Sequence, residues 1–115
     1  IDKMQEQYNC NPKDIICCIS PSIRECHFEV DQDVKDAFLE AFPKETDSIK
    51  QAHEKWHIDT VRINIEMLKE KGLREENIID SKICTVCNCS QIHSYRGSKH
   101  HNGLEMGILE LKGMI

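Results

Sequence analysis

The sequence has little of what marks a membrane protein, a disordered chain or a nucleic-acid-binding domain. No apolar run approaches the ~20 residues of a bilayer-spanning helix, and the longest, Ile15 to Ile19, has the length of a strand. Positive charge is in deficit, because 15 Lys and Arg stand against 20 Asp and Glu. The net charge of −5 argues against a nucleic-acid backbone or an anionic membrane as the main partner. What is present, 39% hydrophobic and 30% charged residues in a chain of 115, is typical of one small folded domain.

The cysteines do not form the even, regularly spaced set of a secreted disulfide-rich domain, because there are seven of them. Cys17 and Cys18 are adjacent inside the most apolar stretch, where thiols behave as small hydrophobic groups. The residues that follow Ile1 do not have the pattern of a signal peptide. We therefore predict reduced thiols and a cytoplasmic location.

Hydrophobic periodicity predicts a small layered sheet with packed helices, an α/β or α+β fold. Helices are predicted over residues 2–8, about 32–42 and about 58–71, and strands over residues 14–20, 77–80 and 105–111. The polar residues 44–56 are predicted to form an exposed connection with a helical turn. So thin a sheet needs more strands beside it, and no helix cap precedes Ile1. We therefore expect residues 1–115 to form one partial domain, the C-terminal portion of a larger single-domain fold.

Each of the two longer helices is predicted to bury one apolar face. For the first helix this face consists of Val34, Ala37, Phe38, Ala41 and Phe42. For the second it consists of Ile58, Val61, Ile65 and Leu68. The polar residues of the second helix, Asp59 and Asn64, are expected to have structural roles, Asp59 near the positive end of the helix dipole.

A group of cysteines near the C-terminus has spacings that suit a metal ion. Cys84, Cys87 and Cys89 are followed by His93, and together they would supply the three sulfurs and one nitrogen of a tetrahedral zinc site. His100 and His101 are further candidates. The adjacent residues Cys26 and His27 do not have the spacing of a standard ligand pair. The alternative is a loop of reduced cysteines without metal.

The residues His93 to Arg96 form a second chemically distinctive segment, which precedes Gly97. The guanidinium of Arg96 offers planar donors that suit phosphate or carboxylate. Tyr95 can stack on a flat ring and donate its hydroxyl. The alternative is an arginine in solvent beside a tyrosine packed on the edge of the core.

Four segments, taken in order, resemble the laccase-domain or multicopper polyphenol oxidase family, whose members are also described as zinc-dependent purine nucleoside phosphorylases with adenosine deaminase activity. The first resembles the family segment Gly-Pro-x-Ile-x-x-Cys-x-Tyr-Glu-Val, although Ser20 replaces its glycine. The others resemble an Asp-x-x-x-x-Asn helix, a Cys-Thr segment and a Ser-Tyr-Arg segment. In this sequence they are Ser20-Pro-Ser-Ile-Arg-Glu-Cys-His-Phe-Glu-Val30, Asp59-x-x-x-x-Asn64, Cys84-Thr-Val-Cys87 and Ser94-Tyr-Arg96.

The resemblance implies an enzyme that acts on a purine nucleoside and phosphate, with Arg96, Tyr95 and His93 in the substrate pocket and no catalytic residue assigned. The family binds its zinc, or copper in the older description, through His-Ala-Gly-Trp-Arg-Gly, Asp-Cys-x-Pro and Val-His-Gly motifs that this sequence lacks. We therefore expect no metal ligand of that centre in this segment. The expected partner is the N-terminal part of the same protein, with homo-oligomer formation left open. The alternative function is a non-catalytic zinc-stapled interaction domain that uses Cys84, Cys87, Cys89 and His93.

Overall fold

The computed structural model describes residues 1–99 and 103–110 and has the mixed helix and sheet architecture that the sequence predicts. The α-helices are α1 (Asp2–Tyr8), α2 (Gln32–Ala41) and α3 (Thr60–Glu70). The strands are β1 (Cys17–Ile19), β2 (Glu29–Val30), β3 (Ile49–Ala52), β4 (Lys55–Ile58) and β5 (Ile78–Asp80). In the described part of the chain no helix is both long and apolar enough to cross a membrane.

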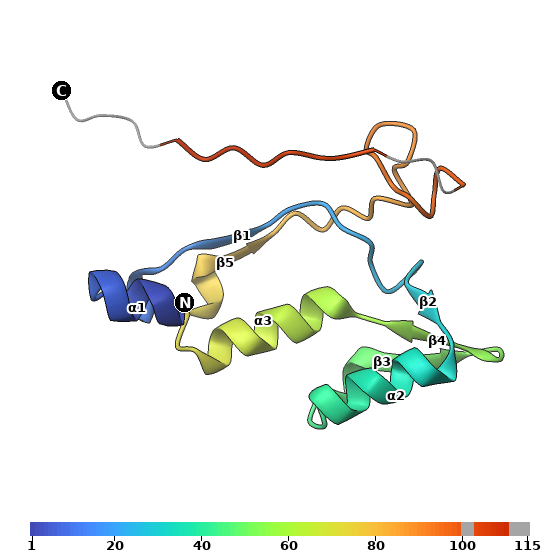
Figure 1. The fold of residues 1–115 in the computed structure, drawn as a ribbon, viewed down its shortest axis with the longest axis horizontal. Helices are drawn as coiled ribbons and strands as arrows, with labels where there is room; N and C mark the ends of the chain where they lie inside the picture. The colour runs from blue at the N-terminus through green and yellow to red at the C-terminus, as the bar shows by residue number, and fades with distance from the viewer. Residues whose placement is uncertain (100–102, 111–115) are drawn as a thin grey trace.

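The strands form two separate small sheets (Figure 1). In the first, β1 pairs in parallel with β5, with Cys17 opposite Ile78. In the second, β4 lies between β2 and β3 and is antiparallel to both. The parallel pair brings together two segments that are far apart in the sequence, and their continuation forms the site described below.

The hydrophobic core lies at the three-stranded sheet, where α2 and the start of α3 pack. Its fully buried centre is Ile58 on β4, which is 0% exposed. The other buried members are Val30, Ile49 and Ile63, and the aromatic and aliphatic residues packed against them are Phe28, Phe38, Leu39, Phe42 and Trp56. Helix α3 begins at its N-cap Asp59, whose side chain accepts a hydrogen bond from the backbone N–H of Arg62 (3.0 Å), as expected from the sequence.

The β3–β4 hairpin corrects the prediction of an exposed connection over residues 44–56. The helical turn predicted within this segment is present as the short 3-10 helix Thr46–Ser48. The strands are short and polar, and the turn between them has no glycine; His53 instead takes a positive φ of 58°. Ile58 belongs to β4 and not to the helix, so its burial comes from the sheet. Tertiary packing on Ile49 and Ile58 therefore outweighs a local sequence with weak strand character.

The buried face of α2 is also rotated from the predicted one. Phe38 and Phe42 pack on the core as predicted, but Val34, Ala37 and Ala41 are exposed, and Leu39 takes part instead. The predicted strand over residues 105–111 is absent from the described residues 103–110, which are extended and exposed; Leu111 lies outside the described part.

Candidate functional site

The parallel pairing of β1 with β5 continues beyond the strands into the two loops that follow them. Ser22 forms an isolated parallel bridge with Cys84. The backbone N–H of Ser22 donates to the carbonyl of Ile83 (3.2 Å), and the N–H of Thr85 donates to the carbonyl of Ser22 (3.1 Å). Residues 22–27 and 83–88 are thereby held next to each other.

A charged pair reinforces this contact. Arg24 donates from Nη1 to Asp80 Oδ2 (2.8 Å) and from Nη2 to Asp80 Oδ1 (2.6 Å). The same guanidinium donates to Ser81 Oγ (3.1 Å) and to the carbonyl of Ile83 (3.3 Å). Hydrogen bonding by Arg24 holds the pKa of the Asp80 carboxyl below its usual value, since it outweighs the opposing effect of burial.

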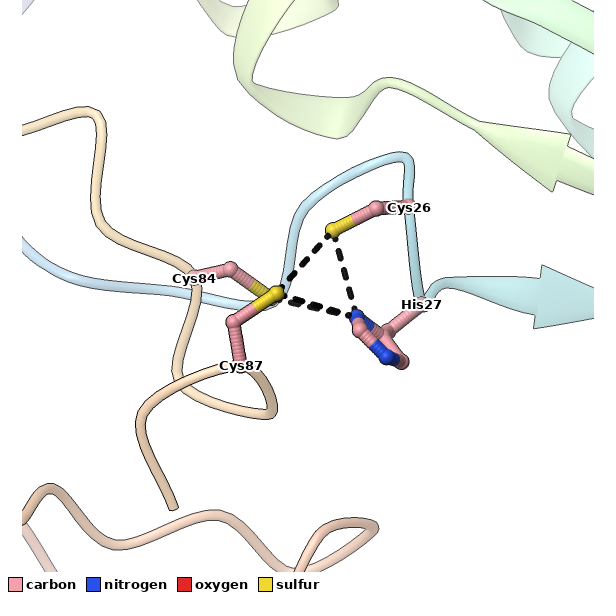
Figure 2. Close-up of side chains that lie close together, drawn as sticks. All are labelled: Cys26, His27, Cys84 and Cys87. Atoms are coloured by element: carbon pink, nitrogen blue, oxygen red, sulfur yellow. Dashed lines mark hydrogen bonds between the residues drawn. The ribbon is translucent and has the colours of Figure 1, made fainter. Parts of the chain in front are cut away.

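Beside this pair, four side chains converge that could hold a metal ion: Cys26, His27, Cys84 and Cys87 (Figure 2). Their ligand atoms all lie within 4.8 Å of one another. His27 Nδ1 lies 3.2 Å from Cys26 Sγ, 3.4 Å from Cys87 Sγ and 3.8 Å from Cys84 Sγ. Cys26 Sγ and Cys87 Sγ are 3.7 Å apart, so the sulfurs are in contact without being bonded. We call these four residues the Cys/His cluster.

Two turns position the Cys/His cluster. Cys26 and His27 lie in a turn closed by hydrogen bonds from the N–H groups of His27 (3.0 Å) and Phe28 (2.8 Å) to the carbonyl of Arg24. Cys84 and Cys87 lie in a turn in which both the backbone N–H (3.2 Å) and the side-chain amide (2.9 Å) of Asn88 donate to the carbonyl of Cys84. Each turn therefore presents two ligand atoms to the same point.

The thiols of the Cys/His cluster differ in acidity. Burial of its sulfur among the other ligand atoms, together with the Cys84 and Cys87 sulfurs, raises the pKa of Cys26 to about 12. Burial also opposes ionisation of Cys84, but hydrogen bonds from the backbone N–H groups of Cys87 and Arg24 outweigh it and lower the pKa of that thiol to about 6. One thiolate thus forms readily, and its charge disfavours a second one nearby.

The Cys/His cluster contains only part of the zinc ligand set that was predicted from the sequence. Cys84 and Cys87 belong to it, whereas Cys89 and His93 do not, within residues 1–99 and 103–110. The side chains of Cys89 and His93 instead pack against the backbone of two glycines. A Cβ atom added to Gly97 would lie 3.3 Å from Cys89 Sγ, and one added to Gly103 would lie 2.8 Å from His93 Nδ1. The further candidates His100 and His101 lie outside the described residues.

Cys26 and His27 are the ligand candidates that the sequence reasoning set aside, on the ground that adjacent residues are not a standard pair. A signal for them was nevertheless present. The strands predicted over residues 14–20 and 77–80 precede Cys26 and Cys84 at similar distances, and parallel pairing of those strands brings the two loops to one edge of the sheet.

Arg96, predicted to bind substrate, lies against the segment that carries Cys26 and His27. Its Nη1 donates to the backbone carbonyls of Glu29 (2.9 Å) and His27 (3.4 Å). Its guanidinium carbon lies 5.0 Å from the centre of the Phe28 ring, within the range of a cation–π contact. Tyr95 beside it is 52% exposed. Tyr95 and Arg96 lie in a turn over residues 94–98. The buried Ser94 closes this turn, because its Oγ accepts a hydrogen bond from the N–H of Gly97 (3.1 Å).

The chain matches the family model for multi-copper polyphenol oxidoreductase laccase over residues 1–112. It is 30% identical over 114 residues to the purine nucleoside phosphorylase YlmD of Bacillus subtilis, covering 97% of this chain and 41% of that protein. It is 29% identical over 96 residues to a purine nucleoside phosphorylase of Bacteroides thetaiotaomicron, covering 82% of this chain and 36% of that one.

Solved structures show the same fold. The crystal structure of YlmD from Geobacillus stearothermophilus superimposes with a TM-score of 0.77 at 25% identity, covering 88% of this chain and 38% of that one. The Bacillus licheniformis hypothetical protein YfiH gives a TM-score of 0.77 at 25% identity, with 86% and 38% covered. The chain thus spans about two-fifths of the length of the Bacillus subtilis relative. Since the family match extends over almost every residue, the resemblance noted in the sequence is confirmed: the chain belongs to the multi-copper polyphenol oxidoreductase laccase family.

Proposed function

We propose that this chain forms the C-terminal part of a purine nucleoside phosphorylase and supplies one wall of its substrate pocket. The observation that carries the proposal is the alignment of nearly the whole chain with two-fifths of a relative that bears this name. The substrates would be a purine nucleoside and phosphate. Adenosine deaminase activity and a cytoplasmic location belong to the same proposal, as the family resemblance implies.

The surface of the parallel sheet supports a larger assembly. Parallel strands are ordinarily covered on both faces, yet Cys18 on β1 and Ile79 on β5 are exposed, Ile79 at 54%. The molecule is also elongated, with extents of 54 × 34 × 22 Å. Its radius of gyration is 16.7 Å, whereas a compact domain of this length would have about 13 Å. The exposed side chains favour further chain packed beside β1 and β5, whereas part of the elongation comes from the exposed residues 103–110.

A groove beside the parallel sheet is suited to such packing. It has a volume of about 570 Å³ and lies between β1 and α3. Its apolar lining includes Cys17, Ile19, Met67 and Leu68. We assign this groove to the N-terminal part of the same protein, because burying apolar surface is what would stabilise that contact.

The arrangement of Arg96 supports a role in phosphate binding. Both of its hydrogen bonds to the described residues come from Nη1, which leaves Nη2 and Nε to donate to an anion. The carbonyls of His27 and Glu29 and the Phe28 ring fix the guanidinium plane, so little side-chain entropy would be lost on binding. Tyr95 and His93 would contact the base or the ribose.

The catalytic zinc of the enzyme would be held by residues outside this chain. A catalytic zinc keeps an open position beside three protein ligands, whereas the Cys/His cluster offers four ligands and is a closed set. The His-Ala-Gly-Trp-Arg-Gly, Asp-Cys-x-Pro and Val-His-Gly motifs are also absent. When bound in the complete enzyme, zinc would lower the pKa of a coordinated water for deamination. This chain would bind and orient phosphate through Arg96.

A chimaera tests the proposal. The matching segment of the Bacillus subtilis relative, 41% of that protein, is replaced with this chain, and phosphate-dependent release of hypoxanthine from inosine is measured. We expect activity that requires phosphate. A folded, soluble chimaera without activity, under conditions in which the parent relative is active, would contradict the proposal. Such a result, together with tightly held zinc in this chain, would favour the alternative of a zinc-stapled interaction domain.

A further inference from the structure

We propose that Cys26, His27, Cys84 and Cys87 bind a structural zinc ion that fastens the loop after β1 to the loop after β5. The inference rests on the geometry of this chain and is independent of the proposed function. It differs from the zinc site predicted from the sequence, because Cys26 and His27 take the places of Cys89 and His93. It is also distinct from the catalytic metal of the family, whose motifs are absent from this sequence.

Four of the six separations within the Cys/His cluster are close to the edges of a tetrahedron around zinc. With Zn–S of about 2.3 Å and Zn–N of about 2.0 Å, two sulfurs lie about 3.8 Å apart, and sulfur and nitrogen about 3.5 Å apart. The observed Cys26–Cys87 sulfur separation is 3.7 Å. The separations from His27 Nδ1 to the three sulfurs are 3.2, 3.4 and 3.8 Å. These four separations need shifts of a few tenths of an ångström to fit around one ion, and the two from Cys84 Sγ to the other sulfurs, which lie within 4.8 Å, need at most about 1 Å.

The chemistry of the four ligands favours zinc. Three thiolates and one imidazole are soft and borderline donors in a tetrahedral set, which selects zinc over the oxygen-seeking magnesium and calcium ions. Binding releases the protons of the thiols and leaves Zn²⁺ with three thiolates and neutral His27, a net charge of −1. The cation removes the repulsion that otherwise disfavours a second and third thiolate at this distance.

The scaffold around the cluster is already in place. The Ser22–Cys84 bridge and the two-point contact of Arg24 with Asp80 hold the two loops together without an ion. The two turns orient one cysteine pair and one cysteine–histidine pair toward a common centre (Figure 2). Because the ligands need not be gathered from a flexible chain, little ordering entropy opposes binding.

Metal content and ligand variants test the site. The 115-residue chain is purified anaerobically with a reductant and dialysed, and zinc per chain is measured by mass spectrometry, with affinity from competition with a chromophoric chelator. We expect one zinc per chain. Cys26→Ser, Cys84→Ser, Cys87→Ser and His27→Ala should each weaken binding by at least about tenfold. The matched controls Cys89→Ser and His93→Ala should bind as the unaltered chain does.

If the serine variants do not fold, a variant that retains four metal ligands still tests the site. Cys87→His preserves four ligands, so it should still bind one Co²⁺ in tetrahedral geometry, with weaker thiolate-to-metal charge-transfer absorption than the unaltered chain. Removing zinc with a chelator should lower the thermal midpoint of the unaltered chain and of the Cys89→Ser control.

Three results would overturn the assignment. One is a folded, reduced chain that holds no stoichiometric zinc. Another is zinc whose affinity depends on Cys89 and His93 and not on Cys26 and His27. The third is a disulfide between Cys26 and Cys87 that forms in preference to zinc binding when both zinc and reductant are present.

Discussion

Arg24 and Asp80, 56 positions apart in the sequence, meet in a two-point contact of guanidinium and carboxylate at 2.8 and 2.6 Å. Their side chains are only 14% and 20% exposed, so water competes weakly for these donors and acceptors. The pair links the loop that precedes Cys26 to the end of β5, which leads to Cys84. It is therefore the main ion pair between the two segments that carry the Cys/His cluster.

Asp80→Asn is expected to lower the free energy of unfolding at pH 7 by about 1–3 kcal/mol, because it removes a charge-assisted pair and leaves Arg24 partly unmatched. Urea unfolding measures the change. Asp47→Asn is the matched control, because the Asp47 side chain is 85% exposed and its pairing with Arg62 is long, at 3.9 Å. An equal effect of the two substitutions would show that the Arg24 contact contributes no special stability.

The same pair predicts a pH dependence. Hydrogen bonding by Arg24 lowers the pKa of Asp80 in the folded chain below its ordinary value of 3.8. A carboxyl whose folded pKa is depressed contributes stability that is present above its unfolded pKa and is lost as the pH falls through its folded pKa. The stability difference between the unaltered chain and Asp80→Asn should therefore be full at pH 5 to 7 and shrink below about pH 4. A difference that stays constant down to pH 2 would contradict this account.

Phe38→Ala should lower the free energy of unfolding by about 2–3 kcal/mol, below the 3–5 kcal/mol range of large core truncations, because Phe38 is only half-buried. Its ring contacts those of Phe28 and Phe42, with centroids 6.4 and 6.3 Å away. Ala37→Ser, on the exposed side of the same helix, should change stability by under about 0.5 kcal/mol. If Phe38→Ala costs no more than Ala37→Ser in urea unfolding, the described packing of α2 is wrong.

In the chimaera, Arg96→Ala is expected to lower kcat/KM by more than about tenfold, because a guanidinium that orders phosphate through two hydrogen bonds contributes on the order of 1.5–3 kcal/mol. Arg96→Lys should recover only part, since an ammonium cannot reproduce the planar fork. The contacts of Arg96 with two carbonyls and the Phe28 ring also predict a stability loss of about 1 kcal/mol.

Arg74→Ala controls for loss of an exposed arginine and should leave the kinetics unchanged. Comparing kinetics with thermal midpoints for Arg96→Ala, Arg96→Lys and Arg74→Ala separates the two roles of Arg96. A lowered midpoint with unaltered kcat/KM would assign Arg96 to the scaffold alone.

The elements with strong local signals could be predicted from the sequence. Asp31 and Pro43 bracket α2, Asp59 caps α3, and the short apolar runs at residues 14–20 and 77–80 contain β1 and β5. The β3–β4 hairpin could not be predicted, because its strands carry few apolar residues and are stabilised by the packing of Ile49, Ile58 and Trp56 in the core. Such packing is a property of the folded chain and not of either segment.

The candidate site could likewise be predicted only in part from the sequence. Cys84 and Cys87 have a recognisable spacing, so they could be predicted as ligand candidates. Cys26 and His27 lie about sixty residues away, and only the parallel register of β1 with β5 brings them to the same place. The spacing also predicts Cys89 as a ligand, but its side chain lies against Gly97 and outside the Cys/His cluster.

The most direct test of the account compares phosphate-dependent inosine cleavage by the 115-residue chain alone with cleavage by the chimaera, both supplied with zinc and freed of host phosphorylase. If this chain supplies a pocket wall and no ligand of the catalytic metal, the chain alone will show no turnover above the blank, whereas the chimaera will show turnover that requires phosphate. Robust phosphate-dependent turnover by the chain alone would contradict the account.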